Sequence, residues 1–271
     1  MSVKYFDAHC HIQFDQYESD REKVLLEMER AEVGGIIVGV DAPSSLPAHA
    51  LVTQHPQAAL FAAAGHHPNH VPLESFDEKT IRTLLADEKV VAVGECGLDY
   101  FRPVEVTGEV KRAQKELFEK HIALAIEYKK PLMIHGRPSK GTMDAYEDLI
   151  DLLRNAKRTH GDTLSAHIHF FVGNVDIAKS LFELNCTVSY TAVVTFAREY
   201  DEVIRYAPLD RLLTETDAPY VAPASRRGQR NDPLSVIDVV RTIASIRAED
   251  EEKVRETVLQ NAKRVFMLGS I

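Results

Sequence analysis

The chain is poor in cysteine and has no long apolar run, and these two shortages exclude several classes of protein. Its three cysteines among 271 residues, Cys10, Cys96 and Cys186, are far apart and include no CxxC pair. That usage argues against a disulfide scaffold. No apolar stretch approaches the roughly 20 residues of a membrane-spanning helix, and the N-terminus lacks a signal-peptide pattern. The sequence therefore predicts a reduced, cytoplasmic protein without a membrane anchor.

Positive charge is also scarce. The chain carries 32 Lys and Arg against 41 Asp and Glu, which gives a formal net charge of −9. Tight binding to long duplex DNA through bulk electrostatics is therefore not expected, although a local basic cluster suffices for one phosphate. The sequence also lacks a GxGxxG or Walker motif. Their absence argues against an open, doubly wound nucleotide-binding sheet.

Short apolar segments and longer amphipathic segments alternate along the chain. The predicted strands are residues 3–9, 34–40, 59–65, 90–95, 131–136, 164–170, 186–190 and 211–217. The predicted helices are residues 18–32, 44–55, 77–88, 108–130, 143–158, 175–185, 195–207, 233–250 and 250–268. Most of the predicted helices have apolar residues at three- and four-residue spacing. Eight such units, without a linker or repeat, predict an α/β fold: a (β/α)8 TIM-type barrel that spans residues 1–271 as one domain.

Histidines and acidic residues follow nearly every predicted strand. They are His9 and His11, His66 and His67, Glu95, His135, His167 and His169, and Glu215 and Asp217. Each residue also has a structural explanation. A lone histidine at a strand end is more often a hydrogen-bonded structural residue than a metal ligand. Glu95 could form an ion pair or cap the next loop, and Asp217 could be a turn residue before Pro219. The C-terminal ends of barrel strands converge, however. We therefore expect these side chains to meet in one place.

Taken together, these residues favour a metal site over independent structural roles. His9 and His11 lie at i and i+2 on a strand and point to the same side. Several imidazoles with carboxylates suit Zn²⁺, Mn²⁺ or a similar divalent ion. One central carboxylate, Glu95, can bridge two ions, and a pair of ions ~3.5–4 Å apart can polarise a phosphoryl group and acidify a bound water.

Ordered sequence blocks resemble the TatD-type metal-dependent hydrolases, a family of amidohydrolase-like barrels. The blocks are FDAHCH, GHHP, VGECGLDY, IHGR, HFFVG, TETDAPY, RRGQRNDP and NAKRVF, and they run nearly from end to end of the chain. Many members of the wider superfamily bridge their metals with a carboxylated lysine, but here strand four ends in Glu95 and strand five in His135. This difference favours the TatD branch over dihydroorotase-like or phosphotriesterase-like enzymes. The resemblance implies an irregular barrel with two divalent ions, whether Mg²⁺, Mn²⁺ or Zn²⁺.

The resemblance also implies roles for individual residues. The ligands of the first ion would be His9, His11, Glu95 and Asp217. The ligands of the second would be Glu95, His135 and His169, with Glu95 as the bridge. Asp217 and Glu95 would be catalytic, and Asp217 would orient the attacking water and accept its proton. The substrate or phosphate contacts would be His67, Arg137, Arg227 and Arg230, although each arginine suits loop anchoring equally well.

Four further residues receive supporting roles. Asp7 is expected to support the two N-terminal histidines as a neighbouring carboxylate. His167 precedes His169 by two residues, so alternation places it on the same side, deeper in the barrel, as a core or supporting histidine. Cys10 and Cys96 are turned toward the opposite face, where buried thiols are expected.

The resemblance implies a divalent-metal-dependent hydrolase, most simply a deoxyribonuclease that acts 3′→5′ on single-stranded or terminal DNA. The same activated water can attack a carbonyl group, so an esterase or amidase, for example an aminoacyl-tRNA deacylase, is the alternative. A non-catalytic scaffold is disfavoured because no ligand position is lost. The chain departs from the family pattern in the loop of residues 138–142, at Val172, and mildly at Gln229 and Asp232, where we expect the substrate pocket to differ.

Overall fold

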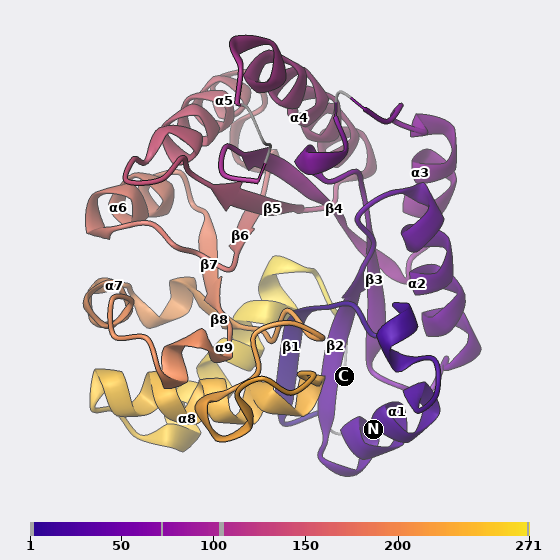
Figure 1. Cartoon of the computed structure of the whole chain (residues 1–271), viewed down its shortest axis with the longest axis vertical. Coiled ribbons are helices and arrows are strands. Elements are labelled where there is room, and N and C mark those ends of the chain that lie inside the picture. Colours follow the sequence, from indigo (N-terminus) through magenta and orange to yellow (C-terminus); the bar gives the residue numbers. More distant parts are fainter. Residues whose placement is uncertain (1–2, 72, 103–105, 270) are drawn as a thin grey trace.

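Eight parallel strands form a barrel in chain order (Figure 1). The computed structural model describes residues 3–71, 73–102, 106–269 and 271. The strands are β1 (Tyr5–Cys10), β2 (Val33–Val38), β3 (Leu60–Ala64), β4 (Val90–Asp99), β5 (Leu132–Arg137), β6 (Ala166–His169), β7 (Thr187–Tyr190) and β8 (Leu212–Thr214). The seam between β1 and the segment after β8 is joined by two bonds: Asp217 N donates to His9 O (2.9 Å) and His11 N to Ala218 O (2.7 Å). The predicted (β/α)8 barrel is confirmed.

Helices surround the barrel, one or more after each strand (Figure 1). They are α1 (Arg21–Arg30), α2 (Ala42–Gln54), α3 (Glu78–Leu85), α4 (Gly108–Tyr128), α5 (Asp144–His160), α6 (Val175–Glu183), α7 (Asp201–Tyr206), α8 (Val236–Arg247) and α9 (Glu251–Val265). The prediction for residues 195–207 was too long, because α7 begins only at Asp201. Residues 192–195 form a separate 3₁₀ turn that Thr191 caps through a bond from Val193 N (3.3 Å). Within the described ranges, no helix is long and apolar enough to cross a membrane.

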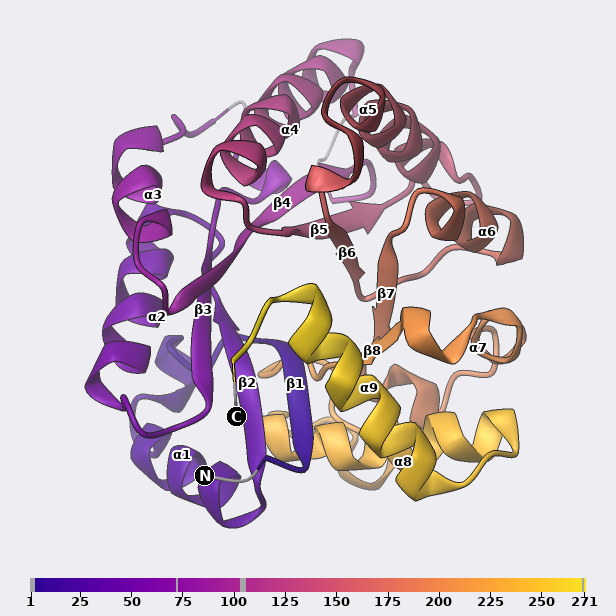
Figure 2. The same cartoon turned by 180° about the vertical axis from the view of Figure 1, so that it is seen from behind.

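Helix α9 closes one end of the barrel (Figure 2). Phe266 and Val265 pack there in one apolar cluster with Phe6, Ile36 and Met133 from the strands. Asn261 Nδ2 donates to Leu212 O (2.8 Å), at the start of β8. Helix α9 therefore covers the N-terminal ends of the strands, and the opposite end is left for the polar side chains.

Two strands carry an extra residue where predicted ligands lie. On β4, Val93 pairs with Leu132 and Cys96 with Ile134, so the register shifts by one around Glu95. The β1–β2 pairing shifts likewise between Asp7 and Cys10, around His9. Such bulges re-aim side chains and are common next to active sites. They are the irregularity that the resemblance implied.

Glycine is required beside Glu95 because strand β5 passes very close. Gly97 has φ +131°, and a Cβ on it would lie 2.1 Å from His135 O. A Cβ on Gly94, at φ +157°, would lie 2.4 Å from Met133 O. No other residue type fits such contacts without moving β5. The two glycines of GECG thus keep Glu95 and His135 on adjacent, tightly paired backbones.

The cysteines lie on the outer side of the barrel wall, as alternation predicted. Cys10 and Cys96 are fully buried in the apolar core between strands and helices. The Cys10 thiol contacts Ile36 O (3.4 Å) and the Cys96 thiol Met133 O (3.5 Å). Burial raises the pKa of both thiols well above its ordinary value. All three cysteines are free.

Candidate metal centre

The C-terminal ends of the strands open into a cavity of about 670 Å³. The predicted ligands that line it are His11, Glu95, His135, His169 and Asp217. His9 lies beside them and is fully buried. The barrel therefore brings all six predicted ligand side chains together, although they come from β1, β4, β5, β6 and the segment after β8.

The first group of ligand atoms converges between β1 and the segment after β8. His9 Nε2 and His11 Nε2 lie 3.1 Å apart. Asp217 Oδ1 lies 3.4 Å from His11 Nε2, and Glu95 Oε2 lies 3.5 Å from His9 Nε2. Two nitrogens bound tetrahedrally to one Zn²⁺ lie about 3.3 Å apart. The spacing fits one divalent ion among these four residues.

The second group converges on the other oxygen of Glu95. Glu95 Oε1 lies 2.8 Å from His169 Nε2 and 3.1 Å from His135 Nδ1. The two imidazole nitrogens are 3.4 Å apart. The two oxygens of Glu95 thus face separate groups of nitrogens, as a bridging carboxylate requires.

Hydrogen bonds behind two of the imidazoles fix which nitrogen faces the cavity. His11 Nδ1 donates to the Val38 carbonyl (2.7 Å), so Nε2 of the neutral ring carries the lone pair. His135 Nε2 lies 3.0 Å from Asp99 Oδ2 and donates to it, which leaves Nδ1 as the lone-pair nitrogen. Contacts of this kind orient metal-binding histidines and raise their basicity.

The electrostatics keep the carboxylates ionised. Burial alone raises the pKa of Glu95, but the electrostatic influence of the neighbouring His169 and His67 rings and the bonds from His135 and His169 outweigh burial and hold the pKa well below its ordinary value. Burial also raises the pKa of Asp217, but the hydrogen bond with His11 and the influence of the neighbouring histidine rings together outweigh it, so the pKa lies below its ordinary value. The chain therefore offers a buried anion, Glu95, and a half-buried one, Asp217, to a cation.

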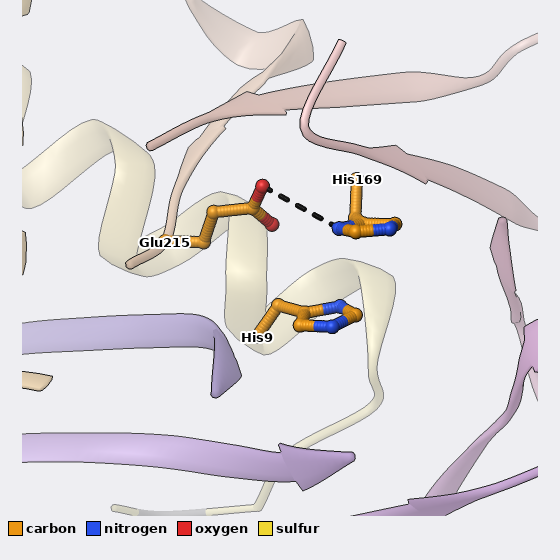
Figure 3. A group of neighbouring side chains, drawn as sticks. All are labelled: His9, His169 and Glu215. Atoms are coloured by element: carbon orange, nitrogen blue, oxygen red, sulfur yellow. Dashed lines mark ion pairs between the residues drawn. The ribbon is translucent and has the colours of Figure 1, made fainter. Parts of the chain in front are cut away.

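Glu215 supports the group from behind (Figure 3). It is fully buried, its Oε1 accepts from Phe170 N (2.5 Å), and it faces His169 Nδ1 at 3.7 Å. The His9 and His169 rings stack with centroids 3.9 Å apart (Figure 3). Glu215 thus lies on the side of His169 away from Glu95 and places a negative charge there, at a distance longer than a hydrogen bond.

His167 is a core histidine, one of the two roles that the sequence allowed. Its nitrogens lie 2.9 Å from Thr187 Oγ1 and 2.8 Å from Ser189 Oγ. Burial keeps its pKa well below the ordinary value. Ser189 Oγ donates in turn to Glu215 Oε2 (2.7 Å). His167 therefore helps to hold Glu215, two contacts away from the cavity.

Asp7 supports the backbone at the seam of the barrel. Its Oδ1 accepts from Thr216 N (2.9 Å) and His9 N (3.2 Å), and its Oδ2 from Thr216 Oγ1 (2.5 Å). Asp217, which follows Thr216 in the chain, has φ +54°. A non-glycine residue in this region costs roughly 1–3 kcal/mol and persists only where its surroundings enforce it. The Asp7–Thr216 contacts supply that enforcement.

A model of the family described as TatD related DNase matches residues 6–267. This chain belongs to the TatD family. It is 35% identical over 268 residues to YabD, an uncharacterized metal-dependent hydrolase of Bacillus subtilis (strain 168), and the match covers 97% of this chain and 99% of that protein. It is 32% identical over 273 residues to a 3′-5′ ssDNA/RNA exonuclease TatD of Pectobacterium parmentieri (strain WPP163), and this match covers 97% of this chain and 100% of that protein. The crystal structure of YJJV, a TatD homolog from Escherichia coli K12, matches with TM-score 0.83 and 25% identity over 99% of this chain and 100% of that one.

The TatD-family chain is accordingly a metal-dependent hydrolase, and the structure separates its three predicted phosphate-binding arginines. Arg137 lines the cavity and lies over the Phe101 ring (4.3 Å). Arg230 instead binds Asp20 through two bonds (2.8 and 2.6 Å), and Arg227 lies over Phe196 (3.9 Å). Neither Arg227 nor Arg230 is among the residues that line the cavity.

Two charged residues at the cavity were not assigned from the sequence. Asp99 ends β4, four residues beyond the predicted strand, and its buried carboxylate accepts from His135, Asn69 Nδ2 (3.1 Å) and two backbone amides. Its place in the block VGECGLDY, which resembles the family motif, was its only signal. Arg102 also lines the cavity and had no signal beyond its charge.

We predict that Asp99→Asn weakens metal binding. Asparagine offers an amide in place of one carboxylate oxygen, so His135 loses the acceptor that keeps its proton on Nε2. Loss of such a contact typically costs about 10–100-fold in metal affinity. Competition between the protein and a chromogenic chelator for Zn²⁺ measures the change.

Asp148→Asn is the matched control for Asp99→Asn. Asp148 is likewise a hydrogen-bonded carboxylate. It accepts from Tyr100 (2.8 Å) and pairs with Lys115 (2.7 Å), but it lies outside the cavity lining. We expect its Zn²⁺ affinity to equal that of the wild type. Equal affinities for all three proteins would contradict the role of Asp99.

Proposed function

We propose that this TatD-family hydrolase is a phosphodiesterase that removes nucleotides from single-stranded or terminal DNA in the 3′→5′ direction. The observation that carries the proposal is the composition of the cavity. Metal-ligand side chains share it with two arginines and a set of aromatic rings. The rings are those of Phe14, Phe170, Tyr200 and Tyr220. The name of the Pectobacterium relative, an ssDNA/RNA exonuclease, supports the same substrate class.

The proposal assigns the ligands to two divalent ions. The first ion would be held by His9, His11, Glu95 and Asp217, and the second by Glu95, His135 and His169. Donors of this kind accept Mg²⁺, Mn²⁺ or Zn²⁺, with the nitrogens favouring the borderline ions. Such a pair, when bound, polarises the scissile phosphoryl group and lowers the pKa of the attacking water.

Asp217 would orient this water and take its proton. Its pKa lies below the ordinary value, so the carboxylate is ionised and able to accept a hydrogen bond at neutral pH. The left-handed φ of +54° and the contact between Asp217 Oδ1 and His11 Nε2 (3.4 Å) hold the group in the cavity. A general base must lie within hydrogen-bond reach of the proton it removes.

His67 would donate a hydrogen bond to a phosphate oxygen. Burial lowers its pKa to about 4, so the ring is neutral near pH 7. Its Nδ1 accepts from Asn69 N (3.1 Å), so the hydrogen is on Nε2, which lies 3.4 Å from Glu95 Oε1. A substrate phosphate in the cavity would offer this Nε2–H a second acceptor.

The rim of the cavity suits nucleotides. Arg102 and Arg137 supply guanidinium groups that hold phosphate oxygens, and Tyr220, 49% exposed, offers a ring on which a base can stack. An exonuclease holds only a few nucleotides at a strand end. The net charge of −9 is therefore compatible with this substrate.

Hydrolysis of a labelled oligonucleotide tests the proposal. With added Mg²⁺, Mn²⁺, Co²⁺ or Zn²⁺, a 5′-labelled single strand should give a ladder of shortened products, and a 3′-labelled strand should release labelled mononucleotide at once. Glu95→Gln and His135→Ala should each reduce the rate by at least roughly 100-fold, because each removes a ligand of the second ion.

Glu127→Gln and His49→Ala are matched controls, because both residues form surface ion pairs, with Arg82 and Asp87. They should retain wild-type rates. An absence of shortening with every metal, from protein that carries bound metal, would contradict the proposal and point to a carbonyl substrate such as an aminoacyl-tRNA ester.

Tyr220→Ala should raise the KM for the oligonucleotide by about 5–150-fold, the equivalent of one lost stacking contact of ~1–3 kcal/mol. Hydrolysis of a small phosphodiester without a second base should change far less. Tyr206→Ala is the control, because Tyr206 is similarly exposed (46%) but lies on α7, outside the cavity lining. Equal effects on both substrates would show that Tyr220 does not bind a base.

A further inference from the structure

A second cluster of potential ligands lies at the edge of the hydrolytic cavity and contains none of the residues assigned to the metal centre. His66, His70 and Glu74 belong to the segment between β3 and α3, and each offers a ligand atom within 4.8 Å of the other two. His70 Nδ1 already lies 2.8 Å from Glu74 Oε2. The sequence blocks that define the metal centre use only the second histidine of GHHP, His67, and leave these three residues without a role.

His66 contributes a buried imidazole to this cluster, and one nitrogen of the ring is unused. The residue is 3% exposed, and among the described residues its Nε2 has no hydrogen-bond partner. Its ring meets the His70 ring edge-on, with centroids 5.2 Å apart. Buried polar atoms are almost always paired, and an exception calls for a missing partner.

The neighbouring histidine on α4 cannot supply that partner. His121 Nδ1 donates to Leu117 O (2.9 Å), so its Nε2 is an acceptor, and it takes the hydrogen of His66 N (3.0 Å). Both nitrogens of His121 are therefore in use. This contact also holds the His66 backbone in place, so that its ring stays directed at His70.

We propose that His66, His70 and Glu74 bind a further divalent ion, of the zinc class. Two imidazoles with one carboxylate form a known donor set for Zn²⁺, whereas Mg²⁺ and Ca²⁺ prefer sites made of oxygen alone. The side chains of Glu74 and His70 are 55% and 24% exposed, so they are free to close on an ion held by the buried His66. The remaining coordination position faces solvent and takes water or an anion.

An ion at this position would secure His67. His66 and His70 flank that residue in the chain, and His67 caps the short 3₁₀ turn Pro68–His70 through the bond from Asn69 N. Cross-linking the two ends of the segment would restrict the motion of the residue between them. His70 also lines the hydrolytic cavity, so the additional ion would lie at its edge.

Metal stoichiometry tests the additional site independently of any hydrolysis. Three proteins are compared: the wild type, the single variant Glu74→Gln and the double variant His70→Gln/Glu74→Gln. Each is dialysed to equilibrium against limiting free Zn²⁺ near neutral pH, and its bound zinc is measured by mass spectrometry. The wild type should bind one more ion per chain than the double variant. Glu74→Gln should lower the affinity for this ion by more than the ~10–100-fold that loss of a merely supporting contact costs.

Hydrogen–deuterium exchange locates the ion. Zn²⁺ should slow exchange in peptides spanning residues 66–76 of the wild type and leave the same peptides of the double variant unchanged. The matched control is Glu22→Gln/His55→Gln, which removes a surface His–Glu pair 3.6 Å apart that has no third ligand in the part of the chain that the structure describes. It should retain the wild-type stoichiometry.

Equal stoichiometry in the wild type and the double variant would overturn the proposal. So would an equal loss in the control, which would indicate adventitious surface binding. Circular dichroism and thermal unfolding in chelator check that each variant is folded. Should the double variant not fold, Glu74→Gln decides alone, because its side chain is more than half exposed and its replacement removes no buried contact.

Discussion

Burial of one carboxylate, that of Glu95, is the constraint on which the rest of the site depends. The side chain is 4% exposed, and an isolated charge in such a position is prohibitively costly. Imidazole nitrogens of four histidines compensate for this cost, at 2.8 Å (His169), 3.1 Å (His135), 3.4 Å (His67) and 3.5 Å (His9). These nitrogens repel one another unless a cation or protons lie between them. The arrangement therefore makes physical sense as a metal centre.

The barrel is adapted to deliver this carboxylate. The bulge on β4 turns Glu95 inward, and Gly94 and Gly97 let β5 approach closely enough to bring in His135. On the other side of the cavity, the Asp7–Thr216 contacts hold the seam at which Asp217 N donates to His9 O. Behind the ligands, Asp99 orients the His135 imidazole and Glu215 places a negative charge beside His169. Irregular backbone and buried polar contacts are thus concentrated at one end of an otherwise apolar barrel.

Much of this could be predicted from the sequence, because it follows from periodicity. Parallel strands of a closed barrel end at the same place, so His9, His135 and His169 had to meet once eight strands were recognised. Alternation also placed Cys10 and Cys96 correctly, since a residue next to a ligand on a strand faces the other way. The resemblance to the TatD family supplied the assignment to individual ions, which spacing alone cannot provide.

Contacts between distant segments could not be predicted in this way. Asp99 was missed because β4 continues through Gly97, where alternation breaks down, and reaches four residues past the expected end. Arg230 was assigned to substrate, but it pairs with Asp20, 210 residues away in the chain, and no local pattern records such a pairing. The same limit left His66 without a specific role, although it was among the histidines at the strand ends, because its unpartnered nitrogen becomes apparent only in the packed structure.

The central claim is that Glu95 bridges two ions, and anomalous diffraction from crystals grown with Zn²⁺ or Mn²⁺ tests it most directly. The account predicts two anomalous peaks about 3.5–4 Å apart in the cavity. One should be in contact with His9, His11 and Asp217, the other with His135 and His169, and each with one oxygen of Glu95. A single peak, or two peaks of which either lacks contact with Glu95, would contradict it.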